Sequence, residues 1–273
     1  MQDKTPTRLA IAGLGTIGLS VARRIDAGEL PGMVLTAVSA RDREAAAKRL
    51  SDFRSPPKVL ALGELAEVAD VIVECAPAAV FREIADSVIA EGKTLVPLSV
   101  GVLLKYPEVM ESLEEAGAKI VVPTGALLGL DAVKAVAEGD VESIRMTTRK
   151  PPAGLKGAPH LVQNDIDVEN ITEPVKVFSG NAREAAIGFP ANVNVGAALA
   201  LAGIGPERTQ VEIWADPTIT RNTHSIAVES DSSRLTMTIE NIPTPENPPT
   251  GKITALSVMA TLRRLVSPMV VGT

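Results

Sequence analysis

Two kinds of hydrophobic pattern alternate along the first part of the chain. Short apolar runs of the strand type are separated by stretches in which apolar residues recur at helical spacing. The apolar runs cover residues 8–12, 33–39, 70–75, 94–98 and 119–122. Helical stretches cover residues 16–28, 43–50, 78–91 and 105–116. Such alternation is typical of a parallel sheet with helices on both faces, so it predicts an α/β domain over residues 1–123.

The pattern changes after residue 122, where strand patterns follow one another with shorter connections. They cover residues 143–148, 209–215, 224–230 and 234–239. The turn residues Asp231-Ser232-Ser233 between the last two predict a hairpin, so the expected sheet is mixed or antiparallel. Residues 124–249 are therefore predicted to form a smaller α+β domain.

A proline-rich segment, Pro243 to Pro249, ends this second region. From Thr250 onward, apolar residues recur at helical spacing, at Ile253, Leu256, Val258, Met259 and Leu262. We expect residues 250–273 to form a C-terminal helix that returns to cover the first domain.

A glycine-rich sequence follows the first predicted strand and precedes the first predicted helix. It reads Gly13-Leu14-Gly15-Thr16-Ile17-Gly18. In a dinucleotide-binding loop the first glycine permits a tight turn, the second lets backbone N–H groups approach a pyrophosphate, and the third allows the helix to pack closely on the sheet. The alternative is a structural turn. We expect a Rossmann-type domain in which a nicotinamide dinucleotide binds to Gly13, Gly15, Thr16, Ile17 and Gly18.

The tip of the second predicted strand lacks the acid that binds the adenosine ribose in many such domains. The chain reads Ser39-Ala40-Arg41-Asp42 there. A guanidinium suits a 2′-phosphate, so Arg41 predicts that NADP is accepted as well as NAD. The alternative is that Arg41 is a solvated loop residue. Asp42 is expected to be the N-cap of the next helix in either case.

Residues that follow the other parallel strands are further candidates, because ligands bind beyond the carboxyl ends of such strands. Ala76 and Ser99 hold these positions, with an ordinary turn as the alternative for Ser99. Cys75 is interpreted as a buried strand cysteine rather than a thiolate nucleophile. Thr124-Gly125-Ala126 precedes a helix predicted over 128–138, whose free N–H groups suit a carboxylate or a carboxamide. The alternative is that Thr124 only marks the start of that helix.

Two asparagines and two histidines complete the candidates. Asn192 and Asn194 open an apolar helix, where amides are poor helix formers unless they cap the helix or bind a ligand. We expect one to be a cap and at least one to contact a ligand. His160 is interpreted as a surface or packing residue. His224 lies where a polar loop enters a strand, which fits either a structural role or acid/base catalysis.

Composition excludes several functional classes. The chain has 273 residues, 45% hydrophobic and 22% charged, which is ordinary for a globular enzyme. A net charge of −6 and 2% aromatic residues argue against nucleic-acid partners. Without a long apolar run or a leader pattern, we expect a cytoplasmic protein that does not bind membranes. One cysteine and two histidines exclude an internal disulfide and a typical zinc site, so no metal is expected.

Taken in order and spacing, the motifs of this chain resemble those of the L-aspartate dehydrogenase family over essentially its whole length. The motifs are residues 13–18, 71–77, 122–126, 129–131, 147–152, 189–195 and 222–226. The resemblance implies a Rossmann domain and a catalytic domain related to dihydrodipicolinate reductase and homoserine dehydrogenase. It further implies that Ala126 and Asn192 contact the cofactor and that His224 is catalytic. Two positions depart from the family pattern: Thr124 and Leu128 replace a common Ser and Gly.

The implied reaction converts aspartate and NAD(P) to iminoaspartate, which hydrolyses to oxaloacetate and ammonia, or runs in reverse. The imine is a precursor in NAD biosynthesis. Such a site holds two carboxylates and exchanges a proton, which the family resemblance gives to His224. Thr124 and Asn194 are the candidate substrate contacts, and Arg149, Lys150 and Arg221 are cations from which no choice is made for the carboxylates.

Two other functions fit the same sequence. One is an NADP-linked reductase for another small oxo acid, imine or aldehyde, and the other is a non-catalytic sensor of the nicotinamide cofactor. The apolar, strand-rich second domain also predicts a homodimer.

Overall fold

The computed structural model describes residues 5–190, 193–244 and 250–273. The chain divides into two compact units. The first contains Met1–Ser99, Tyr106–Pro123 and Ala255–Val270, and the second contains Val100–Lys105, Thr124–Thr254 and Val271–Thr273.

The first unit is built on a parallel sheet with strand order β3-β2-β1-β4-β5-β6. Its strands are β1 (Thr7–Ala12), β2 (Met33–Ser39), β3 (Lys58–Val59), β4 (Val71–Glu74), β5 (Thr94–Pro97) and β6 (Lys119–Ile120). Its helices are α1 (Thr16–Asp26), α2 (Arg43–Leu50), α3 (Leu65–Val68), α4 (Phe81–Ala90), α6 (Pro107–Glu115) and most of α11 (Ile253–Val266), with short 3₁₀ turns at Leu62–Glu64 and Ala78–Val80. This is the doubly wound arrangement of the Rossmann fold, so the predicted fold class is confirmed.

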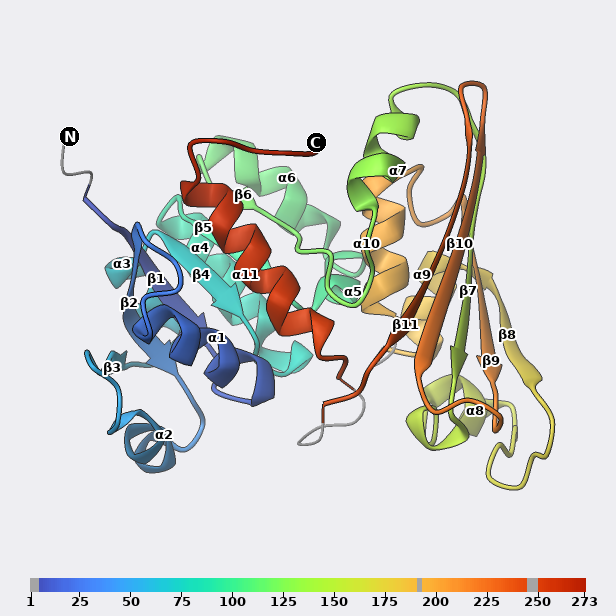
Figure 1. Cartoon of the computed structure of the whole chain (residues 1–273), viewed down its shortest axis with the longest axis horizontal. Helices are drawn as coiled ribbons and strands as arrows, with labels where there is room; N and C mark the ends of the chain where they lie inside the picture. The colour runs from blue at the N-terminus through green and yellow to red at the C-terminus, as the bar shows by residue number, and fades with distance from the viewer. Residues whose placement is uncertain (1–4, 191–192, 245–249) are drawn as a thin grey trace. The chain divides into compact units, whose positions relative to one another are not determined.

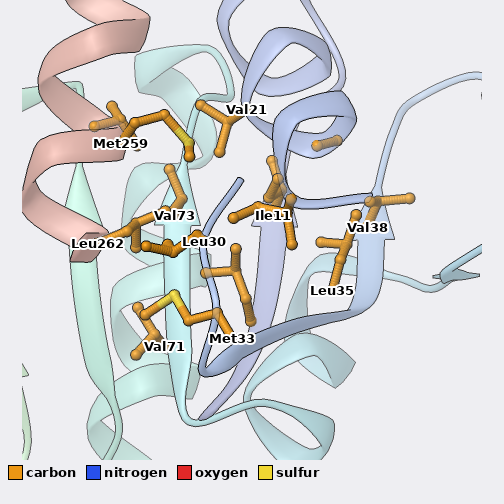
Figure 2. Packing of buried hydrophobic residues seen from close by; sticks show 14 of the residues in the cluster. Ile11, Val21, Leu30, Met33, Leu35, Val38, Val71, Val73, Met259 and Leu262 are labelled. Atoms are coloured by element: carbon orange, nitrogen blue, oxygen red, sulfur yellow. The ribbon is translucent and has the colours of Figure 1, made fainter. Parts of the chain in front are cut away.

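The C-terminal helix α11 belongs to the hydrophobic core of this unit. Val258, Met259 and Leu262 are buried in the same cluster as the side chains of β1, β2 and β4. Figure 2 shows Met259 and Leu262 pointing toward Val73 and Leu30. Three of the five residues that recur at helical spacing in the sequence thus form the buried apolar stripe of an amphipathic helix, whereas Ile253 is half-buried and Leu256 is exposed.

The second unit contains a mixed sheet with strand order β11-β10-β7-β9-β8. The strands are β7 (Val141–Lys150), β8 (Val175–Asn181), β9 (Thr209–Ala215), β10 (Asn222–Ser230) and β11 (Arg234–Asn241). The helices are α5 (Val100–Leu103), α7 (Leu130–Ala137), α8 (Pro159–Gln163), α9 (Ala182–Gly188) and α10 (Asn194–Ala202), with a 3₁₀ turn at Pro152–Gly154. Strands β10 and β11 form the predicted hairpin, and the predicted mixed sheet is confirmed.

One face of this second sheet is covered by helices (Figure 1). Helices α9 and α10 contact the sheet, and Gly196 of α10 lies close to Met146 and Val211. Because side chains alternate along a strand, β7 buries Ile144, Met146, Thr148 and Lys150 on the covered face. On the opposite face, the described side chains are half-buried or exposed.

Several element boundaries differ from the sequence-based expectation. Strand β7 runs on to Lys150, and β10 already begins at Asn222, so His224 lies inside a strand rather than at its entrance. Strand β6 ends at Ile120, and the predicted helix over 128–138 begins only at Leu130. Backbone pairing with neighbouring strands extends β7 and β10 beyond the segments in which apolar residues dominate.

A prediction on stability follows from the packing of α11. Leu262 is fully buried, so Leu262→Ala removes several packed methyl groups and leaves a cavity. We expect the free energy of unfolding to fall by about 2–5 kcal/mol. The matched control is Leu256→Ala in the same helix, whose side chain is 48% exposed and whose loss should cost less than about 1 kcal/mol. Urea denaturation followed by circular dichroism measures both, and equal midpoints for the two variants would contradict the packing.

Candidate active site

The glycine loop lies at the carboxyl end of β1 and opens helix α1. Gly13 has a φ of +104°, and a Cβ there would stand 2.6 Å from the carbonyl oxygen of Cys75. A Cβ on Gly18 would meet the Gly13 carbonyl oxygen. At Gly15, by contrast, a Cβ would have no atom within 4 Å, so this backbone faces open space. Two glycines are required by packing, and the middle one leaves room for a ligand.

The start of α1 offers backbone N–H groups to an anion. Gly15 is the N-cap, no side chain caps the helix, and its first turn carries no acidic residue. Thr16 and Ile17 are half-buried within this first turn. A helix N-terminus of this kind attracts negative charge, so the loop fits the pyrophosphate of a dinucleotide.

The tip of β2 stands next to the glycine loop in the sheet, because the Gly13 N–H donates to the Ser39 carbonyl at 2.8 Å. Arg41 is exposed beyond this tip. Asp42 accepts a hydrogen bond from the Ala45 N–H at 2.9 Å, so its predicted role as N-cap of α2 is confirmed. A second guanidinium, that of Arg49, donates to the Leu14 carbonyl at 3.1 Å. Nothing in the sequence pattern indicated Arg49, because 35 residues separate it from its partner.

A buried carboxylate joins the ends of β4 and β5. Glu74 is fully buried and accepts hydrogen bonds from the N–H groups of Leu98 and Ser99 and from the Ser99 hydroxyl, at 3.1, 2.9 and 3.0 Å. Burial raises the pKa of this carboxyl, and the hydrogen bonds oppose that shift. Glu74 therefore fixes the loop that carries Ser99. The sequence analysis did not predict this role, because Glu74 lies in an apolar run.

Ala76 and Cys75 follow Glu74 at the same edge of the sheet. Ala76 is half-buried, and a Cβ on Gly13 would lie 2.9 Å from its backbone nitrogen. Cys75 packs partly against the core of the first unit. Burial and the neighbouring Glu74 raise the pKa of its thiol well above the usual range, which opposes a thiolate nucleophile.

The first unit thus brings one set of candidates together. The order β2-β1-β4-β5 aligns the carboxyl ends of these strands, which carry Arg41, the glycine loop, Ala76 and Ser99. This edge is where ligands bind in open parallel sheets.

In the second unit, His224 lies on the covered face of the sheet. It is 3% exposed, and its Nδ1 atom is hydrogen-bonded to the Thr148 hydroxyl at 3.0 Å. The two residues are directly opposite each other in the antiparallel pair β7–β10. Burial, together with the positive charge of Lys150, lowers the pKa of His224 to about 3. The imidazole is therefore neutral at physiological pH and oriented through one ring nitrogen.

Lys150 lies two residues beyond Thr148 on the same face. It is 6% exposed, and burial lowers the pKa of its amine to about 8. A lysine at such depth retains its charge at neutral pH but binds its proton less firmly than a surface lysine. His224, Thr148 and Lys150 form a polar group at one end of an otherwise apolar sheet face.

The segment with Thr124 and Ala126 forms a turn rather than the start of a helix. The Leu127 N–H donates to the Thr124 carbonyl at 3.0 Å, and the N-cap of α7 is Gly129, with a φ of 75°. The expected helix N-terminus at Thr124 was therefore wrong. Asn241 anchors the turn, because its side-chain amide donates to the Ala126 carbonyl at 3.0 Å.

Asn194 is the first residue of α10, and its side chain does not cap that helix. Its Oδ1 atom accepts a hydrogen bond from the Gly101 N–H at 2.9 Å, while Val193 is the N-cap. The expected cap is therefore not Asn194. Asn192 lies outside the described residues.

His160 is a packing residue, one of the two roles expected for it. Its ring centroid lies 5.3 Å from that of Phe178 and 5.4 Å from that of Phe189. Phe178 and Phe189 are buried and His160 is half-buried in this cluster, which α8, β8 and the end of α9 form.

Metal clusters and membrane-spanning helices are absent from residues 5–190, 193–244 and 250–273. No cluster of three or more His, Cys, Asp or Glu side chains is arranged to hold a metal ion. No helix there is long and apolar enough to span a membrane.

Comparison with known proteins assigns each half of the chain to a family model. Residues 13–123 match the model described as "Homoserine dehydrogenase, NAD binding domain". Residues 131–265 match "Aspartate dehydrogenase, C-terminal". The two matches meet near the boundary where the strand pattern of the sequence changes.

Relatives that match over the whole chain are L-aspartate dehydrogenases. The L-aspartate dehydrogenase 3 of Bordetella bronchiseptica is 52% identical over 273 residues, covering 100% of both chains. The L-aspartate dehydrogenase of Bradyrhizobium diazoefficiens is 52% identical over 276 residues, covering 100% of this chain and 98% of the relative. Among solved structures, the aspartate dehydrogenase of Thermotoga maritima has a TM-score of 0.75 at 24% identity, covering 97% of this chain and 99% of that one, which shows a common fold. The chain belongs to the L-aspartate dehydrogenase family.

Proposed function

We propose that this chain is an NAD(P)-dependent L-aspartate dehydrogenase. It oxidises aspartate to iminoaspartate, which hydrolyses to oxaloacetate and ammonia, or runs the reductive amination in reverse. The observation that carries the proposal is the buried His224 beside Lys150, in a chain that is 52% identical over its full length to L-aspartate dehydrogenases. We also propose a contribution to NAD biosynthesis, for which the imine is a precursor.

The bound nicotinamide would supply the hydride acceptor or donor for C2 of the substrate. In this proposal residues 1–123 bind the cofactor, 124–249 carry the catalytic groups, and the helical segment 250–273 completes the first domain. The cofactor contacts are Gly13, Gly15, Thr16, Ile17, Gly18, Arg41, Ala76, Ser99, Ala126 and Asn192. Thr124 and Asn194 are the proposed substrate contacts.

His224 moves the proton in this mechanism. Oxidation of the amine requires a base that accepts a proton, and the neutral imidazole of His224 is in the form that accepts one. The Thr148 hydroxyl holds one ring nitrogen, which leaves the other for proton transfer. The same imidazole returns the proton in the reverse direction.

Dual use of NAD and NADP is part of the proposal. The tip of β2 presents an exposed guanidinium and no carboxylate at Ser39-Ala40-Arg41. Arg41 therefore offers charge to a 2′-phosphate without an acid that would repel it.

A homodimer through the uncovered face of the second sheet is also proposed. This face carries Thr147, Ser225, Thr236 and Thr238 around the small residue Ala227, and the described side chains on it are half-buried or exposed. The same face also carries Arg145, Arg149 and Trp214. Two copies that present this face to each other can pair it with itself around a two-fold axis.

The activity itself is tested by absorbance at the reduced-nicotinamide band. With NADH or NADPH, oxaloacetate and ammonia, we expect reduced cofactor to be consumed only when ammonia is present. Pyruvate and 2-oxoglutarate in place of oxaloacetate should give much lower rates. Turnover without ammonia would indicate a reductase for oxo acids, and cofactor binding without turnover on any substrate would indicate a sensor.

The role of His224 is tested by His224→Asn. We expect turnover to fall by about 10²–10⁴-fold, the usual effect of losing a positioned proton-transfer group. Cofactor affinity, measured by fluorescence titration, should change little. His160→Ala is the control: it weakens aromatic packing, but turnover per folded molecule should remain near the wild-type value. Near-normal turnover of folded His224→Asn would refute the mechanism.

The role of Arg41 is tested by Arg41→Ala. Loss of one charge-assisted contact to phosphate should weaken NADP binding by about 1.5–3 kcal/mol and leave NAD binding nearly unchanged. Lys48→Ala, in the last turn of α2, is the matched control and should affect neither cofactor. Equal losses for NAD and NADP in Arg41→Ala would remove the argument for phosphate recognition.

The proposed dimer is tested by Ala227→Arg. A guanidinium in the middle of the uncovered face introduces a charge and a long side chain into the interface. Sedimentation velocity should show a dimer for the wild type and a monomer for the variant. A monomeric wild type, or a variant that remains dimeric, would contradict this interface.

A further inference from the structure

Three cations were candidates for binding the substrate carboxylates, and their environments in the second unit differ sharply. Arg149 lies on the uncovered face, pairs with Asp216 at 3.2 Å and stacks over the Trp214 ring at 4.7 Å. Arg221 is 51% exposed and lies 3.8 Å from Glu240. Both guanidinium groups therefore lie on the side of the sheet opposite His224. Lys150 is the buried cation, on the same face as His224.

A cavity adjoins Lys150 at this end of the sheet. Its volume is about 190 Å³. Its lining residues are Lys150, Pro151, Ala153, Gly154, Thr220, Asn222 and Pro243. They come from the end of β7 and the turn that follows, from the segment before β10 and its first residue, and from the segment after β11. The volume is about six times the roughly 30 Å³ that one water molecule occupies in the liquid, so a small organic anion fits.

We propose that this cavity receives a carboxylate of the substrate and that the Lys150 ammonium binds it. The inference rests on the proposed function, which requires a subsite for a dicarboxylate near the acid/base residue. Most of the lining is apolar or neutral, with Thr220 and Asn222 as the other hydrogen-bonding side chains. Lys150 is the charged side chain among the lining residues, so it determines that an anion is bound.

The register of the sheet relates the position of Lys150 to that of His224. Thr148 pairs with His224 across β7 and β10, and Lys150 follows Thr148 by two residues on the same face. An anion held by Lys150 therefore binds on the same sheet face and at the same end as the imidazole. Burial is the larger cause of the low pKa of His224, and the Lys150 ammonium is the smaller one. The anion would neutralise the ammonium and so raise that pKa. Substrate binding would thus make the His224 imidazole a stronger base.

The test compares Lys150→Met with Lys150→Arg. Methionine keeps a similar length without charge, and the melting temperature of each variant shows whether it is folded. We expect Lys150→Met to raise KM for oxaloacetate by about 10- to 100-fold, the equivalent of one charge-assisted hydrogen bond. Cofactor affinity and the melting temperature should remain near the wild-type values. Lys150→Arg should recover part of the affinity.

Lys134→Met, on the exposed surface of α7, is the control for a change of net charge and should leave KM unaltered. An unchanged KM in folded Lys150→Met would overturn the inference. So would an increase that Lys134→Met reproduces.

A binding measurement separates this inference from the proposed function. Succinate, a dicarboxylate that cannot react, is titrated calorimetrically into the wild type and Lys150→Met, each saturated with cofactor. Binding to the wild type that is lost in the variant supports the subsite even if aspartate is not turned over. Equal succinate affinity in both proteins, or no binding to either, overturns the subsite whatever the outcome of the activity assay.

Discussion

The pairing of β7 with β10 determines the chemistry of the second unit. In this antiparallel register Thr148 stands opposite His224, and Lys150 follows on the same face. Side chains alternate with a period of two, so a slip of one residue would move His224 to the uncovered face and leave Thr148 without its partner. The apolar residues Ile144 and Ile226 lie on the same face and oppose such a slip, because it would expose them to water. Packing of the core thereby maintains the geometry of the site.

In the first unit, a comparable constraint acts at the carboxyl edge of the parallel sheet. Glu74 is buried where an acid is costly, and its three hydrogen bonds from residues 98 and 99 offset part of that cost. Gly13 admits the carbonyl of Cys75 where any side chain would clash. The loops of the proposed cofactor contacts are thus held by contacts between neighbouring strands, which suits a binding site that must be preorganised.

The burial of His224 and Lys150 lowers the stability of the fold over part of the pH range. Both pKa values are lowered, so each residue would be more readily protonated in the unfolded chain. For His224 the unfolded state gains protons as the pH falls below about 6.5, which reduces the stability of the fold down to about pH 3. For Lys150 stability is regained as the pH rises from about 8 to about 10.5. Buried groups of this kind are typical of functional sites rather than of cores that serve stability alone.

Local pattern in the sequence determined the class of both sheets, the position of the glycine loop, the cap at Asp42 and the apolar stripe of α11. These features depend on residues close in the chain, where periodicity and turn chemistry act. The family resemblance, rather than pattern, directed attention to His224. Only the tertiary structure decided that His224 lies within a strand, that Glu74 ties two strands together, and that Lys150 rather than Arg149 is buried beside the imidazole. Those facts depend on strand register and on contacts between residues 24 to 76 positions apart, which no local period encodes.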